Sequence, residues 1–350
     1  MPIQLIRSAI VLLVGTGLCS SALAQDLRDE VYAGSNISQD EATSLESQLV
    51  ESSEDLAARA QLVGYYDGQR FLNYAARVKH VEHVLWFIEN APEANLLAGP
   101  EVLIDEYFAA DGYAKGKDAW SSHLENDPNN LRILKLSANF LRQDDRQLAL
   151  QILNHAQSLD QEEPDWAEQL GQLHRLDSLD SLLRDGARDP EADKRALAQF
   201  ELAYELSDEL RRGYLLPELG TSAFHVGNIE KATAYAEKML EENVEDWNYG
   251  NRSHYGNLTL GRIALLEGNI EEAKSRLIAA GETPGSPQLD SFGPDMTLAR
   301  ELLERGETDA VLEYLSLCSK FWDLGRGDLE GWMAQIKDRK TPDFGSNLMF

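Results

Sequence analysis

Apolar residues recur three and four positions apart along most of this 350-residue chain, and this spacing places side chains on one face of an α-helix. The clearest example is the stretch 71–90, where Val78, Val81, Leu85 and Ile88 share a face. No stretch of useful length alternates apolar and polar residues, as a half-buried strand does. The pattern therefore predicts an all-α protein with essentially no sheet.

One part of this pattern occurs twice. Residues 219–232 read LGTSAFHVGNIEKA and residues 260–273 read LGRIALLEGNIEEA, so eight of the fourteen positions are identical. Both copies contain a Leu-Gly pair, an alanine three positions after its glycine, a Gly-Asn pair and a second alanine. Gly-Asn ends a helix because both residues tolerate the left-handed conformation, and small residues let two helices approach closely. Each copy is predicted to form a helical hairpin, with Ala232 and Ala273 buried between helices.

This repeated pattern resembles the tetratricopeptide (TPR) repeat, which is a helix-turn-helix unit. The resemblance is most specific within 130–282, where Leu170 and Gly171 form the Leu-Gly pair once more. It implies a right-handed superhelical solenoid of antiparallel helix pairs, because one such pair cannot bury its apolar face alone. In TPR arrays the first helix of each pair lines a concave groove that can hold a segment of a partner.

The resemblance also implies which side chains would face that groove. They are Arg132, Lys135, Asn139, Arg142, Arg175, Tyr214, His225, Tyr255 and Arg262. This set is basic and aromatic in an acidic chain, so the expected partner is another protein or peptide segment, and an acidic one. Lys135 and Asn139 match a TPR clamp for a peptide carboxylate, but Tyr214 and Glu218 stand where that clamp has basic residues. Solvated helix residues without a partner are the alternative interpretation.

The chain is predicted to divide into six parts. These are a signal peptide (1–24), a flexible segment (25–39), divergent helical pairs (40–126), TPR-like repeats (127–282), a weaker repeat with a capping helix (283–338) and a C-terminal tail (339–350). Within them, 97–108 is expected to be a helix. The stretch 180–193 is expected to be an exposed loop, because it contains Gly186 and Pro190.

The first 24 residues have the layout of a secretory signal peptide. Arg7 precedes a ten-residue apolar run, 9–18, and Ala-Leu-Ala precedes Gln25. Cleavage between Ala24 and Gln25 would give an exported protein, periplasmic or secreted. No other apolar run approaches 18 residues, so no transmembrane segment is expected in the mature chain.

Charge narrows the choice of partners. The net charge is −28, and removal of Arg7 with the signal peptide makes it −29. Such acidity argues against binding nucleic acid or an anionic membrane surface. After cleavage only Cys318 remains, so no intramolecular disulfide is expected.

The sequence contains no motif of an enzyme that we recognise. HExxH, GxSxG, a phosphate-binding loop and CxxC are all absent, and no cofactor or catalytic residue is expected. His80 and His83 are spaced to hold a metal on one helix, but no third ligand is evident, and a solvated helical face is the favoured interpretation.

The stretch 247–257, WNYGNRSHYGN, is unusually rich in amide, aromatic and imidazole groups, which are common at recognition surfaces. Its candidate ligand contacts are Tyr249, Asn251, His254 and Asn257. The first functional hypothesis is a non-enzymatic, exported TPR-like scaffold that binds a segment of another protein. The alternative is an enzyme or small-ligand binder on a helical toroid, with its site around 247–257. A structural spacer is a third hypothesis.

Overall fold

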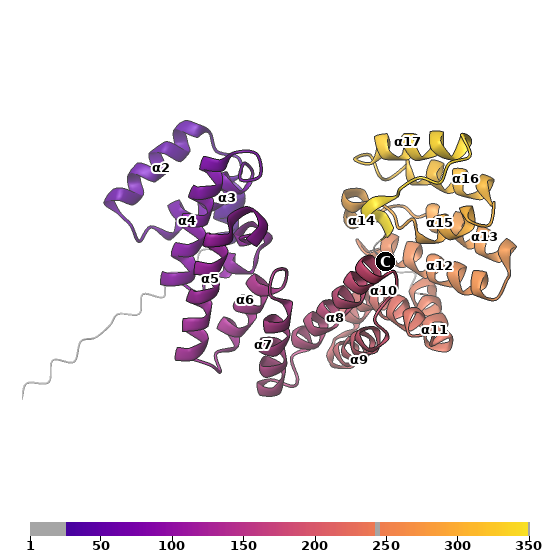
Figure 1. Cartoon of the computed structure of the whole chain (residues 1–350), viewed down its shortest axis with the longest axis horizontal. Coiled ribbons are helices and arrows are strands. Elements are labelled where there is room, and N and C mark those ends of the chain that lie inside the picture. The colour runs from indigo at the N-terminus through magenta and orange to yellow at the C-terminus, as the bar shows by residue number, and fades with distance from the viewer. Residues whose placement is uncertain (1–25, 242–245, 349–350) are drawn as a thin grey trace, which may run out of the picture. The chain divides into compact units, whose positions relative to one another are not determined.

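The computed structural model describes residues 26–241 and 246–348 (Figure 1). These residues form seventeen α-helices and three short 3-10 helices and no strand, which confirms the all-α prediction. None of the helices within them is long and apolar enough to cross a membrane. The predicted signal peptide lies outside the described residues. The chain separates into two compact units, one ending at His123 and the other beginning at Leu124.

The N-terminal unit is an irregular helical cluster. Its elements are α1 (Leu27–Gly34), α2 (Gln39–Glu51), α3 (Leu56–Asp67), α4 (Tyr74–Asn90), η1 (Asn95–Ala98), η2 (Pro100–Val102) and most of α5 (Glu106–Asn126). Helix α3 packs against α1, α2 and α4, and Leu62 and Val63 on it are fully buried. This helix therefore forms the centre of the unit.

The segment 25–39, expected to be flexible, contains α1. The Asp26 side chain caps this helix by accepting a hydrogen bond from the Arg28 backbone N–H. Leu27 and Val31 are buried. The helix crosses α3 closely, since a Cβ added to Gly34 would lie 2.0 Å from the Gln61 carbonyl oxygen. Only one narrow face of α1 is apolar, which is why its sequence looks like a polar linker.

The helix expected over 97–108 is also not there. This stretch contains the end of η1, then η2 and an extended connection into α5. Gly99 precedes Pro100 and has an extended backbone, with φ −82° and ψ 163°, because a proline disfavours the helical conformation of the residue before it. Helix α5 is itself interrupted at Ala109, with φ −146° and ψ 54°.

The C-terminal unit is built mainly from helical hairpins. Its helices are α6 (Leu131–Leu141), α7 (Arg146–Leu159), α8 (Pro164–Asp185), α9 (Pro190–Leu206), α10 (Glu209–His225), α11 (Ile229–Glu241), α12 (Tyr249–Leu266), α13 (Ile270–Gly281), α14 (Pro287–Phe292), α15 (Thr297–Leu303), α16 (Thr308–Cys318), α17 (Arg326–Lys337) and η3 (Gly345–Leu348). The hairpins α6/α7, α8/α9, α10/α11 and α12/α13 each pack internally, and α11 also packs on α12.

The stretch 180–193 is not a long loop. Helix α8 continues to Asp185, α9 begins at Pro190, and a short connection joins them. Gly186 is the left-handed C-cap of α8, with φ 76°, and Pro190 is the first residue of α9. Glycine is common just after a helix and proline is common at its first position. These two residues therefore mark the end of α8 and the start of α9 and not a loop.

The two copies of the repeated segment form equivalent turns. Gly227 and Gly268 have φ of 74° and 78°. The next residue donates its backbone N–H to the alanine carbonyl five positions earlier, at 2.9 Å for Asn228 and 2.8 Å for Asn269. Both asparagine side chains then cap the following helix, at 3.1 and 3.2 Å. Ala232 and Ala273 are fully buried, which confirms the prediction for the hairpins.

The last helices close over a core around Trp322 and Trp332. Helix α17 packs on α16 and buries Leu329 and Ile336. The tail then returns over α17, because Phe344 is buried and the Trp332 indole donates a hydrogen bond to the Asp343 carbonyl at 3.1 Å. The described part of the tail is therefore packed against the unit.

Candidate functional site

A cavity of about 480 Å³ lies where α10, α12, the connection around α14 and the C-terminal tail meet. We call it the aromatic pocket. It is lined by Tyr214, Pro217, Glu218, Trp247, Asn248, Asn251, Tyr255, Gln288, Phe292, Gly293, Pro294, Asp295, Ser346 and Asn347. All of these residues belong to the C-terminal unit.

Helical spacing brings the walls of the pocket together. Tyr214, Pro217 and Glu218 lie three and four residues apart on α10, so they share a face. Asn251 and Tyr255 are likewise four residues apart on α12. Tyr214 and Tyr255 each lie five residues before the two copies of the repeated segment, at the same offset, and the structure places both in the wall. The repeat thus supplies two aromatic side chains to one pocket.

Large aromatic side chains remain exposed in this wall. The Trp247 ring packs on Tyr214 with 4.8 Å between centroids, yet Trp247 is 51% exposed and Phe292 is 78% exposed. An exposed apolar cluster rimmed by polar groups is typical of an interaction site. These two residues are therefore the strongest indication of binding in the pocket.

Side-chain amides hold the start of α12 against α14. Asn251 Nδ2 donates to Asn248 Oδ1 at 2.8 Å and to Gln288 Oε1 at 3.0 Å. Asn251 Oδ1 accepts from the Ser286 hydroxyl at 2.6 Å. Asn248 is 4% exposed, and its Nδ2 has no hydrogen-bond partner among the described residues. The pocket wall thus combines a fixed amide network with an unused donor.

The charged groups that line the pocket are acidic. Glu218 forms an ion pair with Arg175 at 3.3 Å. Asp295 accepts a hydrogen bond from the Thr297 backbone N–H at 2.6 Å. Burial raises the pKa of the Asp295 carboxyl to about 6, although that hydrogen bond opposes the shift. No lysine or arginine belongs to the described lining, so the pocket does not favour an anion.

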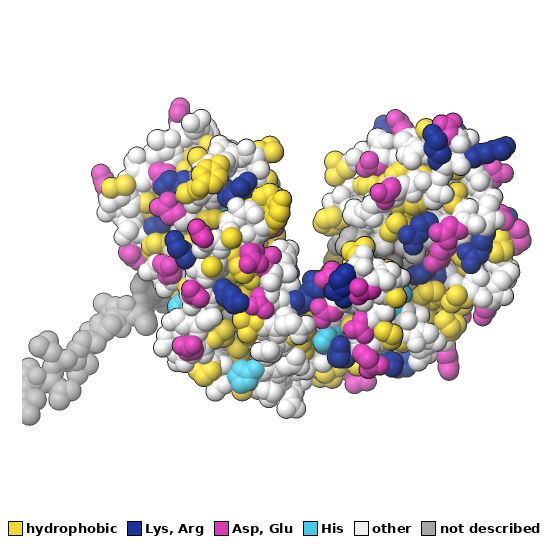
Figure 2. Space-filling model, in the orientation of Figure 1, with side chains coloured by type: hydrophobic (Ala, Val, Ile, Leu, Met, Phe, Trp, Pro, Cys, Tyr) yellow, Lys and Arg dark blue, Asp and Glu magenta, His cyan; other side chains and the backbone are white. Residues whose placement is uncertain are grey.

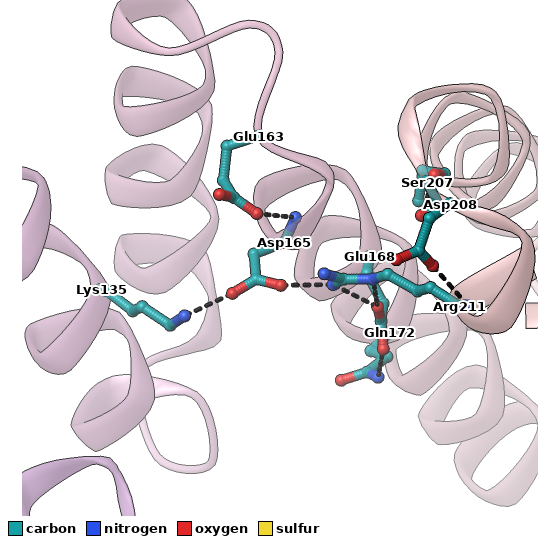
Figure 3. A network of polar contacts seen from close by, with 9 residues as sticks. Lys135, Glu163, Asp165, Glu168, Gln172, Ser207, Asp208 and Arg211 are labelled. Carbon is teal, nitrogen blue, oxygen red and sulfur yellow. Dashed lines mark hydrogen bonds and ion pairs between the residues drawn. The ribbon is translucent and has the colours of Figure 1, made fainter. Parts of the chain in front are cut away.

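Three of the predicted groove cations, Lys135, Arg175 and Arg262, are already paired with carboxylates. Lys135 on α6 contacts Asp165 on α8, and Arg211 on α10 contacts the same Asp165 and, at 2.7 Å, Glu168 (Figure 3). Arg262 pairs with Glu301 at 2.9 Å. On the face seen in Figure 2, basic side chains lie among acidic ones. These cations connect the first helices of successive hairpins and do not form an unneutralised basic groove.

The other predicted groove residues lie near these ion pairs or on α6. Arg132 and Asn139 are on α6, and Arg142 is its C-cap, where burial lowers the pKa of the guanidinium group. Burial, together with nearby arginines that include Arg175 and Arg262, lowers the pKa of the His225 imidazole. His225 is therefore neutral at pH 7 and belongs to the packed part of the face.

The candidate ligand contacts of 247–257 separate into two groups. Asn251 is in the aromatic pocket, whereas Tyr249 faces a neighbouring cavity that includes Gly285. His254 is fully buried; its Nδ1–H donates to the Ala280 carbonyl at 3.0 Å, and Nε2 accepts the Asp295 backbone N–H at 3.2 Å. Asn257 bonds to Ser253 and to Arg276 on α13. His254 and Asn257 are therefore structural, because helix packing uses their polar atoms.

His80 and His83 are buried, so the interpretation as a solvated face was wrong. His83 Nε2–H donates to Glu46 Oε1 at 3.1 Å, and Arg59 donates to His83 Nδ1 at 3.2 Å. His80 Nε2–H donates to the Glu101 carbonyl at 2.6 Å. Across 26–241 and 246–348, no group of three or more His, Cys, Asp or Glu side chains could hold a metal ion.

Sequence reasoning missed Phe292, Pro294 and Gln288 as pocket residues. They lie in and around α14, within a turn-rich stretch that resembles a simple connection between helices. The sequence shows only that an aromatic residue, Phe292, lies between Gly285 and Gly293. In the structure Phe292 is exposed and both glycines have positive φ. Only the packing of α14 on α12 brings them to Tyr255.

No protein-family model matches this sequence, and a comparison with curated proteins finds no similar sequence. The geometry of the site therefore carries the functional argument.

Proposed function

We propose that this chain is a non-enzymatic scaffold that binds a segment of another protein, and that the aromatic pocket holds the anchoring residue of that segment. The observation that carries the proposal is the cluster of Tyr214, Trp247, Tyr255 and Phe292 around one cavity. Aromatic side chains in pockets contribute most of the binding energy at many protein interfaces. Trp247 and Phe292 are exposed at this cavity and are therefore available for such contacts.

The scaffold in this proposal is a TPR-like, right-handed solenoid exported through its signal peptide. Two features support the solenoid. The hairpins α10/α11 and α12/α13 have the same Gly-Asn turn, and α11 packs against both α10 and α12. Ion pairs also join α6 to α8 and α8 to α10, as expected if the first helices of successive hairpins share a face.

The pairing of the cations changes the expected chemistry of the partner. Lys135, Arg175 and Arg262 each have a carboxylate neighbour within the chain. An acidic partner would have to displace these carboxylates, and exposed charge pairs contribute only about 0–1 kcal/mol each. We therefore base recognition on the aromatic pocket and do not propose an acidic partner.

A small-ligand binder is the second candidate. The cavity of about 480 Å³ falls within the range of roughly 300–1,000 Å³ that is usual for small-molecule sites. The amide groups of Asn248, Asn251 and Gln288 would provide its polar contacts.

Selection from a displayed library of random peptides tests the scaffold proposal. Peptides selected on the chain without residues 1–24 are measured by fluorescence anisotropy against that chain and against a Trp247→Ala, Phe292→Ala variant. Both side chains are exposed, so the variant should keep its helical circular dichroism. We expect at least a tenfold loss of affinity, because two anchors are removed.

The matched control is a Leu183→Ala, Leu324→Ala variant, which removes two exposed side chains outside the pocket. It should bind as the parent chain does. Failure to select any peptide, or equal binding by the pocket variant, would contradict the proposal. A small molecule that raises the melting temperature of the parent chain alone would favour the second candidate.

A further inference from the structure

We propose that the aromatic pocket receives a positively charged side chain, a lysine or an arginine, from the bound segment. This inference rests on the proposed function and specifies the chemistry of the anchor. It reverses the sign of charge that the groove residues alone suggested. Three observations carry it: the aromatic rings, the charges in the wall and the apolar surface beside them.

The rings are the first observation. Elsewhere this chain places its own cations over aromatic faces, as with Arg59 over Trp86 at 4.1 Å and Arg262 over Phe224 at 4.3 Å. Among the described residues, no lysine or arginine covers Trp247 or Phe292. The negative face of an aromatic ring attracts a cation, most strongly when the pair is desolvated. These rings are therefore open to a cation from outside.

The charges are the second observation. Both ionisable acids in the wall, Glu218 and Asp295, can become negative, and the described lining has no basic residue. Arg175 offsets part of the Glu218 charge, whereas Asp295 has no ion-pair partner among the described residues. An acidic side chain entering this pocket would meet like charge, and a basic side chain would meet opposite charge.

The apolar surface is the third observation. Pro217 and Pro294 lie in the wall with the rings. Lysine and arginine have aliphatic stems that bury well along such surfaces while the charged end reaches a polar group. A long basic side chain thus matches the rings, the carboxylates and the prolines of the wall.

Four small probes test the charge preference directly. They are the Nα-acetyl, C-terminal methylamide derivatives of lysine, arginine, norleucine and glutamate; norleucine has the lysine stem without its charge. Binding is followed through the Trp247 indole N–H resonance, assigned with a Trp247→Phe variant. We expect lysine and arginine to bind at least threefold more tightly than norleucine, with glutamate weakest. Equal or tighter binding of norleucine or glutamate would overturn the inference.

A matched pair of variants tests the role of the pocket charge. Glu218→Gln and Glu201→Gln each remove one negative charge and one ion pair, with Arg175 and Lys231 respectively. Their side chains are similarly exposed, at 24% and 26%, but Glu201 is outside the pocket. We expect Glu218→Gln to weaken the lysine probe at least threefold and Glu201→Gln to leave it unchanged. Equal effects of the two substitutions would count against the inference.

The two proposals fail in different ways. If displayed peptides bind through Trp247 and Phe292 but norleucine equals lysine, the charge inference is wrong and the scaffold proposal stands. If the lysine probe is preferred but no peptide binds, the cation does not come from a polypeptide segment and the scaffold proposal is wrong. The pocket then prefers a free organic cation.

Discussion

The two copies of the repeated segment share a turn but differ in what surrounds their first helices. In the first copy, a Cβ added to Gly220 would meet the Met239 Cε at 3.2 Å, which is the end of a flexible side chain. In the second copy, a Cβ added to Gly261 would lie 2.4 Å from Leu298 Cδ2 and 3.0 Å from Arg276 Cβ. The glycine of the Leu-Gly pair can therefore be replaced by a larger residue in α10, whereas in α12 the close contact requires glycine.

The copies differ again at the N-terminal ends of these helices. Asp208 is the N-cap of α10, and its side chain accepts the Arg211 backbone N–H at 2.9 Å. Helix α12 begins against the connection to α14, and Gly250 touches Gly285 there. Positions that correspond in sequence thus make different contacts, because the start of α12 packs against the connection to α14 and the start of α10 does not.

The largest effect is expected at Gly250, whose counterpart in the first copy is Glu209. A Cβ at position 250 would lie 1.8 Å from the Gly285 carbonyl oxygen, so the backbone must move. We expect Gly250→Ala to lower the free energy of unfolding by about 3 kcal/mol, measured by urea denaturation. Glu209→Ala should cost at most about 0.5 kcal/mol. Similar effects of the two substitutions would mean that the close approach is not real.

The second effect concerns pH and His254, whose counterpart is Gly213. Burial lowers the pKa of the His254 imidazole to about 4, from 6.5. In the unfolded chain this imidazole therefore binds a proton below pH 6.5, whereas in the folded chain it binds one only near pH 4. The buried neutral imidazole therefore contributes its full stabilisation above pH 6.5. As the pH falls towards 4, the free energy of unfolding decreases by on the order of 3 kcal/mol.

A His254→Asn variant isolates that contribution. Asparagine keeps a donor for the Ala280 carbonyl but does not titrate. The variant should be less stable at pH 7, and its deficit should shrink on acidification to pH 4, as measured by urea unfolding at each pH. A constant deficit would show that His254 is not buried in its neutral form. Asp295 has the opposite trend and contacts His254 through its backbone, so the same comparison is repeated with Asp295→Asn in both proteins.

The third effect compares the two Leu-Gly glycines. Gly261→Ala should cost about 1–3 kcal/mol, because Leu298 and Arg276 must move. Gly220→Ala should be neutral or stabilise by up to about 1 kcal/mol, since alanine favours the helix and only the Met239 methyl group must yield. Thermal unfolding of the two variants makes the comparison, and equal changes in melting temperature would contradict it.

The smallest effect should be the same in both copies. Gly227 and Gly268 have positive φ, and a Cβ added to either would meet no atom within 4 Å. Replacement by alanine should cost about 1 kcal/mol at each position, through backbone strain alone. Urea denaturation should give matching values. A clear difference between them would show that the turns are not equivalent.

Local features of the structure could be predicted from the sequence to a useful extent. The Gly-Asn turn follows from backbone preferences of two adjacent residues, and the burial of Ala232 and Ala273 follows from helical spacing within one hairpin. Errors arose where few residues determine an element. Helix α1 has one narrow apolar face, and the proline at position 100 prevented a helix that spacing alone predicted over 97–108.

The sequence by itself determined the repeated hairpins, their turns and the aromatic positions at 214 and 255, because these depend on residues within a few positions of one another. Only the tertiary structure decided which polar groups are available to a partner. Asp165 neutralises Lys135, and the Asp295 backbone engages His254, although each pair is far apart in the chain. The pocket has the same origin, since Trp247 and Phe292 face one cavity only when α14 packs on α12. Contacts of this kind depend on how whole helices pack, so they cannot be predicted from the spacing of residues along the chain.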